Sequence, residues 1–158
     1  MKRSTCVYLI RDDKWLMLLR NKKQNDVNHG KWIGVGGKNE GEETFAQCAE
    51  REVYEETGCR VNRLDYMGMV DFRYSSSEPE QIAVYTCRDF SGEPGLCTEG
   101  TLAWIEENRI LDLALWEGDR IFLEYMISGR HLPFVLTLEY DDAGNLTNVT
   151  EGETAGYE

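Results

Sequence analysis

The chain has 158 residues, and its 29 acidic side chains against 17 basic ones give a net charge of −12 at pH 7. This length suits one domain with a sizeable core, which we assign to residues 1–150, with 151–158 as a polar, disordered tail. Such an acidic balance, without a basic patch, argues against a nucleic-acid polymer as partner. No apolar run approaches the ~18 residues of a membrane span, so we expect no membrane partner, and charged residues interrupt the N-terminal apolar stretch too early for a signal peptide.

The five cysteines are odd in number and lack the close spacing of a metal site. They are Cys6, Cys48, Cys59, Cys87 and Cys97. We therefore expect reduced thiols and a cytoplasmic location.

The first half of the chain predicts a hairpin followed by a helix. Residues 6–11 and 14–20 are apolar-rich runs on either side of Asp12 and Asp13, which predicts two strands and a tight turn. Phe45, Ala49 and Val53 recur at the helical spacing, which predicts a helix over residues 43–57 with one buried face. Gly58 follows it, where a left-handed residue ends a helix.

The second half predicts strands over residues 61–74, 81–90 and 101–105, separated by turn-rich segments. Apolar residues at helical spacing predict a helix over residues 120–127 that begins a few residues earlier. Residues 134–140 and 146–150 predict a terminal hairpin. Many strands with few helices are typical of an α+β sandwich.

Three glutamates of the predicted first helix, Glu52, Glu55 and Glu56, lie three and four residues apart. Their side chains share one patch near the helix C-terminus, where repulsion and the helix dipole both disfavour anions. A divalent cation would offset this cost, and clustered carboxylate oxygens suit Mg²⁺, with Mn²⁺ as an alternative. The competing interpretation is an ordinary solvated acidic face.

The spacing of the whole segment resolves this choice. Gly37 is followed after five residues by Glu43, and after seven more by Arg51-Glu52-Val53-Tyr54-Glu55-Glu56-Thr57-Gly58. This pattern resembles the Nudix box, and only Cys59 departs from it, where an aliphatic residue is usual. The resemblance implies a Nudix-type α/β/α sandwich with a mixed sheet and the catalytic loop and helix on one side.

The resemblance also implies roles for individual residues. Glu52 and Glu56 would be the principal metal ligands, with Glu55 and the carbonyl of Gly36 assisting. Arg51 would orient the carboxylates of the box by pairing with them. For the general base, Glu52 is the first candidate and Glu99, in a downstream loop, is the second.

The segment before the box is basic, with six Lys or Arg and one acid over residues 14–38. Lys23 and Lys38, together with Lys22 and Lys31, flank the glycine turn and suit a small polyphosphate. The alternative is a solvated basic loop.

Outside the box, the chain is similar to MutT-type oxidised purine nucleoside triphosphatases, in Gly30-Lys31-Trp32, Gly68 with Phe72, and Leu115-Trp116-x-x-Asp119. The resemblance implies that Trp116 stacks on the purine, Asp119 binds its edge and Phe72 lines the pocket. Ile33 and Gly118 depart from that pattern, since the family has Asn and Asp there. Packing in the core is the alternative for Trp116 and Phe72, and for Tyr8, a further pocket candidate.

The sequence therefore predicts a Mg²⁺-dependent hydrolase that splits a dNTP into monophosphate and pyrophosphate, with oxidised purine nucleotides such as 8-oxo-dGTP as candidate substrates. A hydrolase of another nucleoside diphosphate derivative, such as ADP-ribose, is the competitor of the same class. A nucleotide-binding sensor without catalysis is the competitor of a different class. We expect a monomer or a homodimer.

Overall fold

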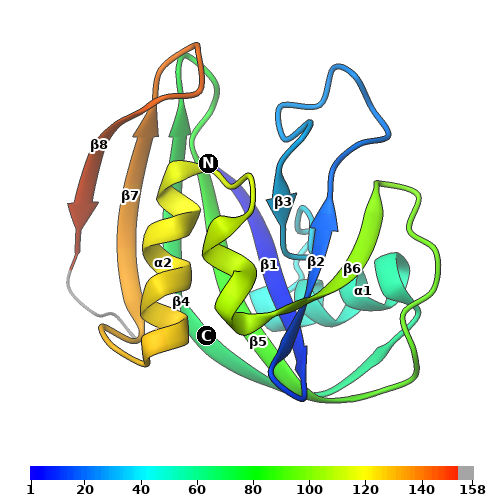
Figure 1. Cartoon of the computed structure of the whole chain (residues 1–158). Helices are drawn as coiled ribbons and strands as arrows, with labels where there is room; N and C mark the ends of the chain where they lie inside the picture. The colour runs from blue at the N-terminus through cyan, green and yellow to red at the C-terminus, as the bar shows by residue number, and fades with distance from the viewer. Residues whose placement is uncertain (153–158) are drawn as a thin grey trace.

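The computed structural model describes residues 1–152, which form a twisted mixed sheet with two α-helices (Figure 1). The elements in chain order are β1 (Lys2–Arg11), β2 (Lys14–Leu19), β3 (Trp32–Ile33), α1 (Phe45–Thr57), β4 (Arg60–Tyr74), β5 (Glu80–Ser91), β6 (Thr101–Glu106), the 3-10 helix η1 (Glu107–Asp112), α2 (Glu117–Ser128), β7 (Phe134–Tyr140) and β8 (Leu146–Glu151). Within residues 1–152, every helix is too short or too polar to cross a bilayer.

The predicted hairpin at the start of the chain is confirmed. Asp12 and Asp13 adopt φ angles of 50° and 63°, as a tight hairpin turn of the primed type requires, and Arg11 pairs with Lys14. Strand β1 begins at Lys2, earlier than the predicted residue 6. Its first residues are held by parallel pairing with β5, beginning at Lys2 and Glu80, and no local sequence pattern reveals such a distant partner.

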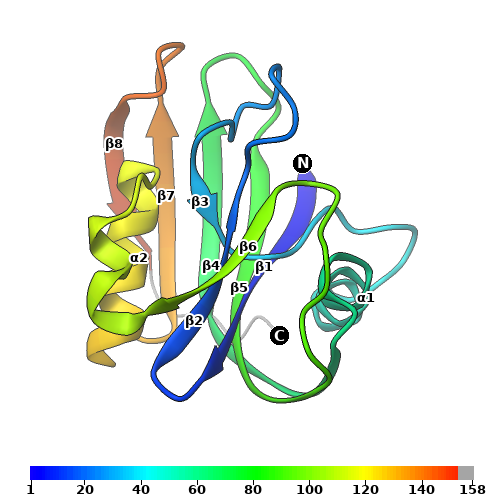
Figure 2. The ribbon, with the colours of Figure 1, turned by 45° about the vertical axis from the view of Figure 1, so that its right-hand side comes forward.

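The sheet order is β3-β2-β1-β5-β4-β7-β8, and β6 pairs with β2. The pairs β1–β5 and β4–β7 are parallel and the other pairs are antiparallel, so the sheet is mixed as predicted. Helices α1 and α2 lie on opposite sides of the strands (Figure 2). The predicted α/β/α sandwich is confirmed.

The burial of β1 shows why a helix covers each face. Tyr8 and Ile10 belong to the core beneath α2, whereas Val7 and Leu9 belong to the core beneath α1. All four side chains are buried, so the central strand reads as a continuous apolar run.

Helix α1 has the predicted apolar face and the predicted end, since Phe45, Ala49 and Val53 are buried and Gly58 adopts φ 81°. It begins at Phe45, slightly later than predicted, because Thr44 forms a capping box. The Thr44 hydroxyl accepts a bond from the Gln47 amide, and the Gln47 side chain accepts one from the Thr44 amide.

The later strands and α2 lie where the sequence predicted them, to within a few residues. The exceptions are β3 and η1, which are short and have no periodicity that predicts them. Glu151 is a correction, because it ends β8 by pairing with Leu136 and does not begin a disordered tail. The rest of that predicted tail, from residue 153, lies outside the described residues.

Candidate functional site

The glycine turn before α1 is pressed against strand β1. The Thr5 amide donates to the Gly37 carbonyl at 2.9 Å, and a Cβ at Gly36 would lie 2.0 Å from the Thr5 carbonyl oxygen. Gly36 also has φ 155°, which favours glycine. On the other side of the turn, a Cβ at Gly37 would lie 2.6 Å from the carboxyl carbon of Glu52. Only glycine allows this backbone to approach both β1 and the helix carboxylates.

Arg51 is the centre of a carboxylate network. Its Nε and Nη2 bind the two oxygens of Glu43 at 2.6 and 3.0 Å, and its Nη1 lies 2.8 Å from Glu52 and 3.2 Å from Glu55. Nη2 also donates to the Lys38 carbonyl at 3.0 Å, which ties α1 to the glycine turn. The hydrogen bonds that the Arg51 guanidinium donates to Glu43 lower the pKa of that carboxyl group.

Glu56 faces a different partner. It is largely buried, and its Oε1 accepts a bond from the Gly36 amide at 2.7 Å. Burial raises the pKa of Glu56 to about 7 against the opposing effect of that hydrogen bond. Burial also raises the pKa of Glu52, although the Arg51 hydrogen bond opposes it. Perturbed carboxylates beside a glycine turn are typical of a functional site.

The predicted convergence of the three glutamates is only partly observed. Within residues 1–152, no three Asp, Glu, His or Cys side chains form a ready-made cation site. The reason is that Glu52 and Glu55 point to Arg51, whereas Glu56 points to the Gly36 amide. The donor chemistry still suits Mg²⁺, since the carboxylates of Glu56 and Glu52 lie against the Gly36 amide and Gly37, and the Gly36 carbonyl accepts no hydrogen bond from any described residue.

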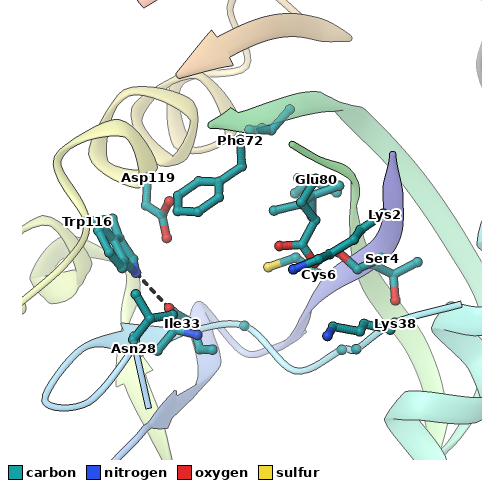
Figure 3. A pocket seen from close by; sticks show the side chains of 18 of the residues that line it. Lys2, Ser4, Cys6, Asn28, Ile33, Lys38, Phe72, Glu80, Trp116 and Asp119 are labelled. Atoms are coloured by element: carbon teal, nitrogen blue, oxygen red, sulfur yellow. Dashed lines mark hydrogen bonds between the residues drawn. The ribbon is translucent and has the colours of Figure 1, made fainter. Parts of the chain in front are cut away.

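A cavity of about 430 Å³ opens on the α2 side of the same glycine turn. Its lining includes Phe72, Trp116 and Asp119 at one end and Lys38, Ser4 and Glu80 at the other (Figure 3). The structure thus brings together four of the predicted substrate-binding residues.

Two further candidates lie elsewhere. Tyr8 does not line this cavity; it is fully buried, with its ring 5.6 Å from that of Trp15. This position corresponds to the core alternative. Lys23 is also absent from the lining; it is exposed, and its Nζ lies 3.3 Å from Glu99.

Trp116 directly precedes α2 and is only 5% exposed. The rings of Phe72 and Tyr140 lie 5.6 and 4.9 Å from it, both close to perpendicular. The Nζ of Lys31 lies 5.3 Å from the centre of the ring. Trp116 is therefore both a packed aromatic and part of the cavity wall.

Asp119 lies one turn further along α2 and faces the cavity (Figure 3). Among the described residues, none donates a hydrogen bond to its carboxyl group. Burial raises the pKa of Asp119 to about 7, partly offset by the charge of Lys31. Gly118 beside it has no room for a side chain, because a Cβ would lie 2.5 Å from Leu138 and 2.6 Å from the hydroxyl of Tyr140. That hydroxyl accepts a bond from the Gly118 amide at 2.7 Å.

Glu99 is held by cations. Its Oε2 lies 3.5 Å from Arg20 and 3.3 Å from Lys23, and Arg20 in turn lies 2.8 Å from Asp26. Arg20 and Asp26 line the cavity, as does Asn28, and the sequence pattern singled out none of them. They lie in an irregular segment after β2, where only Arg20 contributed to a sequence signal, the positive charge of the basic stretch. All five cysteines are free, as predicted.

Comparison with known proteins agrees with this geometry. A model of the NUDIX domain matches residues 1–126, so the chain belongs to the Nudix family. It is 29% identical over 111 residues to the oxidized purine nucleoside triphosphate hydrolase of Danio rerio, covering 70% of this chain and 71% of that protein. It is also 27% identical over 149 residues to the uncharacterized Nudix hydrolase YvcI of Bacillus subtilis, covering 89% and 90%.

Among solved structures, the MutT protein from Bacillus halodurans superposes with a TM-score of 0.84 at 22% identity, over 98% of this chain and 100% of that one. At that identity the likeness concerns the fold. Together with the family match and the relatives, it identifies a MutT-type Nudix hydrolase, an enzyme that acts on nucleotide pyrophosphate bonds.

Proposed function

We propose that this enzyme is a Mg²⁺-dependent nucleoside triphosphate pyrophosphohydrolase. It cleaves a purine dNTP to the monophosphate and pyrophosphate, and oxidised purines are candidate substrates. The observation that carries the proposal is the position of the glycine turn. One side of the turn adjoins the cavity with Trp116 and Asp119, and the other adjoins Glu52 and Glu56.

This arrangement supports different binding regions for the base and the phosphates. The base would enter the aromatic end of the cavity, where a π-face and a carboxyl group are available. The phosphate chain would pass the glycine turn, whose close backbone packing leaves space for it. Lys38 lies in the cavity wall there, and Lys23 lies further out beside Glu99.

The carboxylates of α1 supply the chemistry. Glu52, Glu55, Glu56 and the Gly36 carbonyl would hold Mg²⁺ or Mn²⁺, which neutralises phosphate charge and acidifies a bound water when present. Glu52 is the first candidate for the base, since its raised pKa favours proton uptake. Glu99 is the second, and Arg20 and Lys23 lie against its carboxylate. Arg51 positions Glu52. A cytoplasmic location accords with the free cysteines.

The test compares 8-oxo-dGTP, dGTP, dATP and ADP-ribose at equal low concentration with Mg²⁺, measuring pyrophosphate, phosphate and nucleoside monophosphate. We expect pyrophosphate and a monophosphate from the purine triphosphates. A preference for 8-oxo-dGTP would mean that recognition does not require a polar group at Ile33. Cleavage of ADP-ribose alone would indicate a hydrolase of nucleoside diphosphate derivatives instead. No turnover of any of the four compounds would favour a nucleotide-binding sensor without catalysis.

A further inference from the structure

Asn28 lies in the loop between β2 and β3, and its backbone is fixed on both sides. Its amide donates to the carboxylate of Asp26 at 3.1 Å, and its carbonyl accepts a bond from the Lys31 amide at 2.8 Å. The side chain reaches across the loop and forms part of the cavity wall beside Trp116 (Figure 3). A polar side chain on a fixed backbone at the aromatic end of the cavity is suited to reading a ligand.

The orientation of this amide follows from chemistry. The indole nitrogen of Trp116 can only donate, and it lies 2.8 Å from the Oδ1 of Asn28. The oxygen must therefore face Trp116, which directs the NH₂ group away from the indole. No described residue accepts a hydrogen bond from that NH₂ group. Two N–H donors are thus held in place without an acceptor among residues 1–152.

The neighbouring positions make these donors important. Ile33 lines the same part of the cavity and cannot form hydrogen bonds, and Gly118 has no side chain and no space for one. Asp119 lies one helical turn from Trp116, and its carboxyl has no donor among the described residues. At the aromatic end of the cavity, Asn28 therefore offers donors and Asp119 offers two acceptor oxygens.

We propose that Asn28 determines base specificity, by donating from its NH₂ group to the carbonyl oxygen of a 6-oxopurine while Asp119 accepts from that base. This inference rests on the proposed function and names the base that the enzyme selects. The Watson–Crick edge of guanine presents one acceptor, O6, followed by two donors, N1–H and N2–H. One amide donor followed by a carboxylate complements this edge.

Adenine does not fit the same pair of groups. Its edge presents a donor, the 6-amino group, where Asn28 also donates, and an acceptor, N1, where the carboxylate also accepts. Unpaired polar groups of this kind are what gives a binding site large discrimination between ligands of similar shape. The inference therefore selects guanine-type nucleotides over adenine-type ones.

The test is Asn28→Asp, studied at pH 8 so that the new carboxylate is ionised. An aspartate oxygen still accepts the Trp116 bond, but the two N–H donors are lost. The matched control is Asn25→Asp, which adds the same charge to an exposed position of the same loop. Calorimetric affinities for dGMP and dAMP, and kcat/KM for dGTP and dATP, are measured for wild type and both variants.

We expect Asn28→Asp to lower the preference for guanine over adenine about tenfold in both measurements, the effect of one lost hydrogen bond. Asn25→Asp should leave that preference at the wild-type value. An unchanged preference in Asn28→Asp, with indole fluorescence like that of wild type, would mean that Asn28 only holds Trp116, and the inference would be wrong. If the wild type hydrolyses neither triphosphate, the proposed function fails, whereas the affinities for the monophosphates still decide the role of Asn28.

Discussion

At the scale of single residues, Arg51 explains how α1 tolerates its carboxylates. The helix has no basic residue in its last turn, where Glu55 and Glu56 lie, so neither repulsion nor the helix dipole is relieved locally. Arg51, one turn earlier, binds Glu52 and Glu55 instead and also closes a bidentate pair with Glu43. The same contacts draw Glu52 and Glu55 away from Glu56, so cation binding and pairing with Arg51 compete for the same oxygens.

Glu52 is the residue whose loss should affect turnover most. The Glu52→Gln variant keeps the shape of the side chain and the fold but loses the charge, so we expect kcat to fall about a hundredfold or more. The affinity for nucleotide should change little. The measurement is steady-state kinetics with Mg²⁺, with Glu50→Gln, an exposed position on the same helix, as the control. Turnover near that of wild type in Glu52→Gln would rule out its assigned role.

Asp119 should make stability depend on pH. Its pKa is about 7 in the folded protein and 3.8 in a model peptide, so the folded state holds this proton more tightly. The contribution of this proton to the free energy of unfolding is fully present below about pH 4 and is lost as the pH rises through 7. We compare the free energy of unfolding of Asp119→Asn with that of wild type at each pH. Because solvent partly screens this half-buried carboxylate, we expect the difference to favour the variant by about 1–2 kcal/mol more at pH 8 than at pH 4.

Urea unfolding at both pH values measures this difference. The control is Glu117→Gln, which removes an exposed carboxylate from the same helix. The pKa of Glu56 is also raised, so Glu56 makes the stability of the wild type depend on pH in the same way. The contribution of Asp119 is therefore the difference between variant and wild type at each pH. A parallel pH profile for Asp119→Asn and wild type would contradict the prediction.

At the scale of elements, the start of α2 is fitted to β7 by the absence of a side chain. A Cβ at Gly118 would approach Leu138 and the Tyr140 hydroxyl to 2.5 and 2.6 Å. We expect Gly118→Ala to destabilise the protein by about 1–3 kcal/mol despite the higher helix propensity of alanine, and to lower Tm by several degrees. Thermal unfolding measures this, with the exposed Glu117→Ala as the control. A variant as stable as wild type would show that β7 can move to admit the methyl group.

The sequence predicted the elements that have a local pattern. Alternation and helical spacing located α1, α2 and the long strands, and Gly58 marked the end of α1. The parallel pairing of β1 with β5, which brings Ser4 to within 2.7 Å of Glu80 at the cavity, depends on residues far apart in the chain. The resemblance to the Nudix box predicted that Arg51 pairs with carboxylates of the box, but not that this pairing would draw Glu52 and Glu55 away from Glu56. Asn28 had no sequence signal, because its role depends on the indole of Trp116, which is 88 residues away.

At the scale of the whole molecule, the net charge of −12 means that any added salt screens repulsion and stabilises the fold to some degree. A specific metal site should add to this general effect. We expect MgCl₂ to raise Tm above the value in NaCl of equal ionic strength, since a ligand that binds the folded state stabilises it by mass action. Chelation by EDTA should remove the excess.

The additional rise in Tm with MgCl₂ should also be smaller in Glu56→Gln, because the most buried of the three candidate metal-binding carboxylates then loses its charge. Glu50→Gln has the same net charge as Glu56→Gln, so their difference separates a local loss of metal binding from a change in overall repulsion. Equal Tm values in MgCl₂ and NaCl for the wild type would show that metal does not bind the free enzyme. The proposed Mg²⁺ would then have to enter together with the nucleotide, whose phosphates would supply the ligands that the free enzyme lacks.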